Sequence, residues 1–78
     1  MKNFYIKMYN SKGYNPCGCT YNYLCKNELK TTRGMINRIN RGYYHIPKDT
    51  TKIEVFEYTN VYKEDTYKLV YSKLLFHK

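Results

Sequence analysis

The chain has 78 residues, among them 14 Lys and Arg, 6 Asp and Glu, 11 Tyr and no Trp. A chain of this length forms a single small domain over residues 1–78. Its small core leaves little room for an enclosed active site, so a binding module is expected rather than an enzyme. The formal net charge of +8 favours an anionic partner.

The positive charge is concentrated in the first part of the chain. Residues 1–48 carry nine Lys or Arg and one acid, Glu28, whereas residues 49–78 carry five basic and five acidic residues. Charge that served solubility alone would not need this asymmetry, whereas a partner-binding surface would produce it.

The N-terminal sequence "MKNFYIKMYN" alternates apolar and polar residues and lacks the apolar centre of a secretory signal. No apolar run reaches the length of a transmembrane helix. From the sequence we therefore expect a soluble, cytoplasmic protein that has no membrane partner.

Alternation of apolar and polar residues predicts a first strand over residues 3–9. Its buried face would carry Phe4, Ile6 and Met8, and its other face Tyr5, Lys7 and Tyr9.

Turn-forming residues fill positions 10–18, and the alternation resumes over residues 19–25. In this second strand Tyr21, Tyr23 and Cys25 would share one face. A β-hairpin formed by the two strands is the simplest interpretation.

The sequence "LKTTRGMINRINRG", residues 29–42, predicts the one helix. Thr31 or Thr32 can cap its start, and Gly42 can end it in the left-handed conformation. At 100° per residue, the apolar arc consists of Thr32, Met35, Ile36 and Ile39. The outward arc consists of Arg33, Gly34, Asn37, Arg38 and Arg41. An exposed Gly34 costs about 1 kcal/mol relative to alanine, and is explained by close approach of a partner or by neutral drift.

After an irregular connection at residues 43–50, β-branched and aromatic residues predict strands over residues 52–60 and 66–76, joined by residues 60–65. The predicted fold is α+β, in the order β-β-α-β-β: two hairpins form a four-stranded antiparallel sheet with one helix packed on one face. The other face would be open and carry tyrosines and lysines, namely Tyr5, Lys7, Tyr9 and some of Tyr21, Tyr23 and Tyr58.

The alternation in the third strand is irregular. Phe56 and Tyr58 fall on the same side as Glu54, so either both faces of the strand are covered or a bulge lies near Phe56. In the last strand, regular alternation would place Tyr67, Leu69 and Tyr71 together, opposite Lys68, Val70 and Ser72.

The cysteines Cys17, Cys19 and Cys25 permit a zinc site only if His45 or His77 is a fourth ligand. Structural zinc ligands usually form two spaced pairs, so reduced, inert thiols are the simpler interpretation. A nucleophilic pair of Cys25 and His45 would lack an orienting group and an oxyanion hole. We therefore expect no cofactor, no metal and no catalytic residues.

The candidate partner-binding residues lie on the basic helix face and the open sheet face: Arg33, Arg38, Arg41, Lys30, Asn37, Tyr5 and Tyr9. The basic side chains could contact phosphates, and the tyrosines could stack on unpaired bases. The same residues would also suit an acidic protein surface, because Tyr and Arg are enriched at interface hot spots. A solvated helix face, with tyrosines that pack against one another, is the alternative.

The last strand also suggests a homodimer. Its apolar end, Leu74, Leu75 and Phe76, would either pair with a second copy or close the core of the domain itself.

The segments "FYIKMYNSKG" and "YLCKNELKTTRGMINRI", followed by "IEVFEYTN" and "YKLVYSK", give the chain a resemblance to a known class. It resembles the small accessory proteins that phages and mobile elements of low-GC bacteria encode, among them anti-CRISPR inhibitors. The resemblance implies a non-catalytic inhibitor of a host nuclease or ribonucleoprotein effector in the bacterial cytoplasm. Because the chain is basic, mimicry of DNA is not expected. The alternative is direct, largely sequence-independent binding of nucleic acid.

Overall fold

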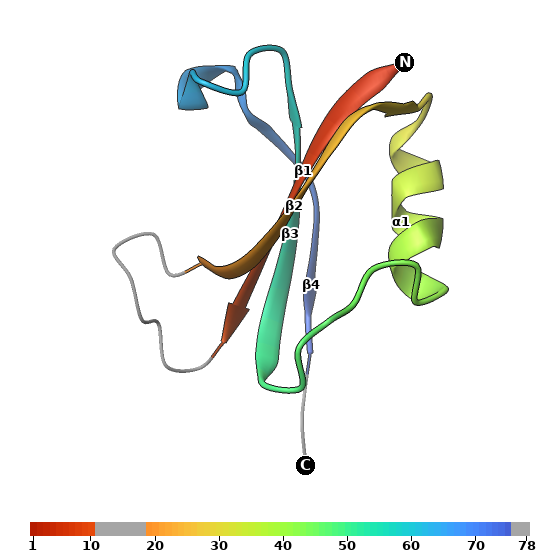
Figure 1. The fold of residues 1–78 in the computed structure, drawn as a ribbon, viewed down its shortest axis with the longest axis vertical. Helices are drawn as coiled ribbons and strands as arrows, with labels where there is room; N and C mark the ends of the chain where they lie inside the picture. The colour runs from red at the N-terminus through yellow and green to blue at the C-terminus, as the bar shows by residue number, and fades with distance from the viewer. Residues whose placement is uncertain (11–18, 76–78) are drawn as a thin grey trace.

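The computed structural model describes residues 1–10 and 19–75. Its elements are β1 (Lys2–Asn10), β2 (Cys19–Leu29), α1 (Thr32–Asn40), β3 (Thr50–Tyr58), the short 3₁₀ helix η1 (Glu64–Thr66) and β4 (Lys68–Leu74) (Figure 1). The strands form one antiparallel sheet in the order β2-β1-β3-β4. The predicted α+β fold, with two hairpins and one helix, is confirmed. No helix in the described residues is long and apolar enough to cross a membrane.

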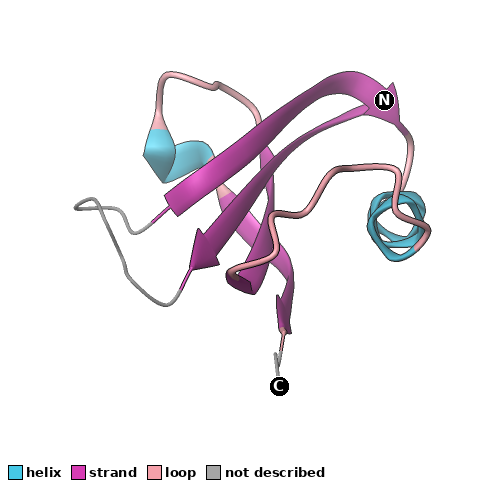
Figure 2. Cartoon of the chain, turned by 60° about the horizontal axis from the view of Figure 1, so that its bottom comes forward, coloured by secondary structure: helices cyan, strands magenta, loops and turns pink. Residues whose placement is uncertain are grey.

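The core lies between the helix and one face of the sheet, here called the helix side. Phe4, Ile6 and Met8 of β1 are fully buried, as the alternation predicts. They pack with Met35 and Ile39 of α1. Figure 2 shows the helix nearly end-on beside the twisted sheet, whereas η1 lies on the other side. The other face of the sheet is here called the open side.

The register places the β2 tyrosines on the helix side. Tyr21 pairs with Met8, and Tyr23 pairs with Ile6, so these side chains share the face of the core residues. The prediction that some of Tyr21, Tyr23 and Tyr58 lie on the open side is confirmed, but not by these two residues. Of the three tyrosines in that prediction, Tyr58 lies on the open side, since it pairs with Asn3.

The irregular alternation near Phe56 arises because both faces of β3 are covered there, and a separate bulge lies in the strand beside it. The strand β3 is regular against β1 around Phe56, which pairs with Tyr5 on the open side. Both faces are covered here, because the Tyr67 ring lies 6.2 Å from the Phe56 ring on the side away from the helix. The bulge lies in the neighbouring strand β4, where Val55 pairs with Tyr71 but Phe56 pairs with Leu69.

This bulge makes the predicted alternation of the last strand wrong. The extra residue, Val70, changes the parity of β4, so Leu69 faces the open side and Tyr71 faces the helix side. Tyr71 accordingly packs against the core, whereas Leu69 is exposed. At the end of the strand Leu75 packs against the core and Leu74 is exposed, while Phe76 lies outside the described residues.

Both ends of α1 have the predicted signals. The Thr31 hydroxyl caps the start by accepting a hydrogen bond from the Gly34 N–H at 3.1 Å. At the other end Gly42 has φ +77°, and the Gly42 and Tyr43 N–H groups donate to the carbonyls of Ile39 and Arg38. This pair of bonds is a Schellman motif, which requires the left-handed residue that glycine supplies at least cost.

The prediction that Gly34 is exposed is wrong. It occupies the third helical position and is half-buried. A Cβ atom there would lie 3.3 Å from the Thr31 hydroxyl and 3.6 Å from Leu29. The contact with Leu29 would be an ordinary one, but the contact with the Thr31 hydroxyl would be tight, so the glycine leaves space for the helix cap and has an explanation that needs no partner.

A bend near the end of β2 connects the sheet to the helix. Asn27 has a positive φ of 58°, and its N–H donates to the Asn3 side chain at 2.8 Å. Asparagine tolerates this left-handed conformation better than most residues. The pairing is irregular here, since β1 advances from Lys2 to Phe4 while β2 moves from Leu29 to Cys25.

Candidate interaction surfaces

Exposed basic and amide side chains on α1 and at its two ends are here called the helix ridge: Lys30, Arg33, Asn37 and Arg41. All four are exposed. Arg33, Asn37 and Arg41 are spaced four residues apart, so they share one face over roughly 12 Å of helix. Among the described residues, no acidic side chain forms an ion pair with Lys30, Arg33 or Arg41. The positive charge of the ridge is therefore not neutralised by an ion pair within the described residues.

Arg38 differs from the other arginines because it has partners within the domain. Its guanidinium lies 3.4 Å from the Glu28 carboxylate and donates to the Tyr44 hydroxyl at 3.3 Å. It also stacks over the Tyr43 ring at 4.5 Å. Arg38 is half-buried, and it links β2 to the segment that follows the helix. The sequence pattern, which grouped it with Arg33 and Arg41, could not reveal this structural role.

The Tyr44 hydroxyl also contacts the Cys25 thiol. The two atoms are 3.1 Å apart, and both residues are buried. Burial raises the pKa of the Cys25 thiol, and it raises the pKa of Tyr44 to about 12. A buried thiol with a raised pKa is a poor nucleophile. The His45 carbonyl accepts a hydrogen bond from Tyr23, and the His45 ring lies beside the Tyr21 ring, with centroids 6.2 Å apart.

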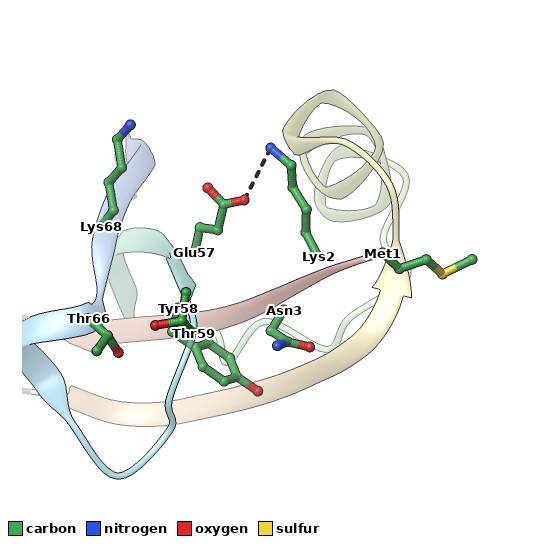
Figure 3. Close-up of a pocket in the computed structure, with 8 residues that line it drawn as sticks. All are labelled: Met1, Lys2, Asn3, Glu57, Tyr58, Thr59, Thr66 and Lys68. Carbon is green, nitrogen blue, oxygen red and sulfur yellow. Dashed lines mark ion pairs between the residues drawn. The ribbon is translucent and has the colours of Figure 1, made fainter.

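No metal site is formed by the described residues, in which no three His, Cys, Asp or Glu side chains come together. Cys17, the side chain of Cys19 and His77 lie outside what the structure describes. An open pocket of about 470 Å³ lies at one end of the sheet (Figure 3). Its single acid, Glu57, forms an ion pair with Lys2 at 3.1 Å, so the pocket has no pair of carboxylates for acid–base chemistry.

The open side of the sheet carries an apolar row that crosses all four strands: Leu24, Tyr5, Phe56 and Leu69, each paired with the next. The Tyr67 ring covers this row at Tyr5, with ring centroids 5.6 Å apart. The Lys7 ammonium lies over the rings of Tyr5 and Phe56, at 5.7 and 5.3 Å.

Tyr5 and Tyr9, the two open-side tyrosines among the predicted site residues, are both half-buried. The Lys52 ammonium lies 5.4 Å from the Tyr9 ring centroid, just as Lys7 lies over Tyr5. The predicted stacking surface is therefore largely occupied by neighbouring side chains.

A second group of aromatic rings, which sequence reasoning missed, lies on the helix side. The rings of Tyr21, Tyr23, Tyr44 and Tyr43 follow one another at centroid distances of 5.2, 5.1 and 4.9 Å. This group is here called the aromatic chain. Tyr44 is buried, whereas Tyr43 is 63% exposed and Tyr21 is 41% exposed. The parity of β2 could have indicated Tyr21 and Tyr23, but the residues after the helix gave no periodic signal.

No family model, curated protein or solved structure matches this chain. The assignment of a function therefore depends on the surfaces described above.

Proposed function

We propose that this chain is a small, non-catalytic binding protein that engages a nucleic-acid machine, and that the helix ridge contacts the phosphate backbone of its nucleic acid. The observation that carries the proposal is the ridge itself. It combines Arg33, Asn37 and Arg41, which share one exposed helix face, with the exposed Lys30 just before the helix, and no acidic side chain among the described residues forms an ion pair with its three basic members.

Phosphate is the anionic group that best fits this surface. A phosphate backbone presents regularly spaced charges, and neutralising them releases counterions. Two arginines separated by roughly 12 Å along the helix, with Lys30 before its start, could contact several phosphates at once. Asn37, between Arg33 and Arg41, could donate to a phosphate or a base edge.

Inhibition of a host effector is the sharper form of this proposal, in line with the resemblance to anti-CRISPR proteins. One observation favours it: the ridge and the apolar row lie on opposite sides of the sheet. The row includes Leu24 and Leu69, whose side chains are 49% and 50% exposed. One molecule could therefore contact nucleic acid through the ridge and a protein subunit through the open side.

The test compares two triple variants that change the net charge equally. The ridge variant carries Lys30→Glu, Arg33→Glu and Arg41→Glu, and the control carries Lys26→Glu, Lys63→Glu and Lys68→Glu. All six residues are exposed. Arg38 is left unchanged, because its loss would disturb the contacts to Glu28 and Tyr44.

Binding to labelled DNA would be measured by fluorescence anisotropy at several salt concentrations. We expect the ridge variant to lose binding and the control to retain most of it. For wild type, the slope of log affinity against log salt should be about −0.9 per phosphate contact on duplex and about −0.7 on single strands. Equal losses in the two variants, with both folded, would contradict the proposal.

A pull-down from host lysate, with and without nuclease treatment, separates the two forms of the proposal. An effector subunit that remains bound after treatment supports the inhibitor. Recovery of nucleic acid alone, lost on treatment, supports direct binding.

A further inference from the structure

We infer that the form of nucleic acid recognised is single-stranded, with an unpaired base stacked on Tyr43 at the end of the aromatic chain while the helix ridge holds the adjacent phosphates. This inference rests on the proposed function, because it needs the ridge to bind nucleic acid, and it adds the class of strand and the residue that selects it.

Tyr43 is both exposed and held in place. The residue is 63% exposed, yet its ring stacks with the Arg38 guanidinium at 4.5 Å and meets the Tyr44 ring at 4.9 Å and 73°. Its N–H donates to the Arg38 carbonyl within the Schellman motif. A ring fixed in this way loses little conformational entropy when a ligand stacks on it.

Tyr62 shows that an exposed tyrosine is not necessarily held in place by neighbouring side chains. Tyr62 is 93% exposed, and no ring contact involves it among the described residues. It lies between β3 and β4, away from the ridge, whereas Tyr43 follows Arg41 by two residues. Tyr62 therefore provides a matched control for Tyr43.

The chemistry selects single strands over duplex. Base faces in a duplex are already stacked on their neighbours, whereas single-stranded bases offer a free π-face to an aromatic ring. Proteins that bind single strands combine a positive path for the backbone with aromatic rings for the bases. The ridge supplies the first of these features, and Tyr43, with Tyr21 at the other end of the aromatic chain, supplies the second.

The experiment measures the affinity of a labelled oligonucleotide of about twelve nucleotides, single-stranded and as its duplex, at one fixed low salt concentration. The variants are Tyr43→Leu, Tyr43→Phe and the control Tyr62→Leu. We expect the single strand to bind more tightly than the duplex. Tyr43→Leu should weaken single-strand binding about tenfold and leave duplex binding unchanged, and Tyr43→Phe should retain wild-type affinity.

The outcomes separate this inference from the proposed function. If both forms bind equally, or if Tyr43→Leu weakens binding no more than Tyr62→Leu, the inference is wrong while the ridge remains the binding surface. If neither form binds, or the ridge variant binds as well as wild type, the proposed function and the inference both fall. Circular dichroism of each variant confirms that a loss of binding is not a loss of fold.

Discussion

The Sγ atom of Cys25 lies 3.1 Å from the phenolic oxygen of Tyr44, and both side chains are buried between β2 and the segment after the helix. The same hydroxyl accepts a hydrogen bond from Arg38, which in turn contacts Glu28. A single tyrosine oxygen thus connects the core to the basic helix. These contacts hold Tyr44 in place. Tyr44 is the neighbour of Tyr43, the residue on which the single-strand inference depends.

Replacing Tyr44 by phenylalanine should lower the free energy of unfolding by about 1 kcal/mol. The ring would still fill its site, but Cys25 and Arg38 would each lose a polar partner. Urea unfolding measures the change. Tyr62→Phe, at a side chain that is 93% exposed, should have no effect, and equal effects of the two variants would contradict this account.

Stability should fall in alkaline solution partly through Tyr44. Burial raises its pKa from 10.0 to about 12, so the folded state favours the neutral phenol. The stability from this group is complete below about pH 10 and is lost as the pH rises toward 12. The buried Cys25 thiol acts in the same direction, since its pKa is also raised.

Urea unfolding at a series of pH values, in wild type and Tyr44→Phe, tests this pH dependence. The difference in stability between the two proteins should narrow between pH 10 and 12. A constant difference would show that Tyr44 does not titrate in this range. Tyrosines common to both proteins, such as Tyr58 and Tyr67, cancel in the comparison.

Gly42→Ala should destabilise the fold by about 1 kcal/mol. Gly42 has φ +77°, and an added Cβ would meet nothing within 4 Å, so the cost comes from backbone strain alone. Gly42→Asn should cost less, because asparagine tolerates the left-handed region better. Thermal or urea unfolding of both variants checks this order, and a neutral Gly42→Ala would refute it.

Thr31→Ala should also cost about 1 kcal/mol, because it removes the side chain that caps α1. Thr31→Ser, which keeps the hydroxyl, should stay close to wild type. Far-ultraviolet circular dichroism during urea unfolding reports both variants. If serine proved as destabilising as alanine, the methyl group rather than the cap would account for the effect.

The neighbours Leu74 and Leu75 should respond differently to substitution. Leu75 packs against the core, whereas Leu74 is 63% exposed on the open side. We expect Leu75→Ser to destabilise the fold by about 1 kcal/mol or more and Leu74→Ser to leave stability nearly unchanged. A large effect at Leu74, together with a change in molecular mass by light scattering, would instead indicate that a second copy covers it.

The fold was predictable because local signals and burial agree over most of the chain. The alternation of Phe4, Ile6 and Met8 and the caps at Thr31 and Gly42 each depend on nearby residues alone. The position of the bulge at Val70 was not predictable from the sequence of β4, because a bulge depends on how the strand pairs with its neighbour, here β3. The sequence indicated an irregularity only at the partner residue, Phe56.

The candidate site was predictable in part. The helical period placed Arg33, Asn37 and Arg41 on one exposed face, as the structure has them. It could not separate Arg38 from this group, because the partners of Arg38 come from β2 and from the segment after the helix. Tyr43 was missed for the same reason: its orientation depends on tertiary contacts.

The bulge in β4 also affects the tendency of the chain to aggregate. As an outer strand, β4 offers unpaired backbone groups that a strand of another molecule could extend into an aggregate. The extra residue Val70 interrupts the regular ladder, and the exposed lysines Lys68 and Lys73 place charge on either side of it. These are the devices by which natural sheets resist edge-to-edge association. This outer strand is thereby made a poor template for pairing with a strand of another molecule.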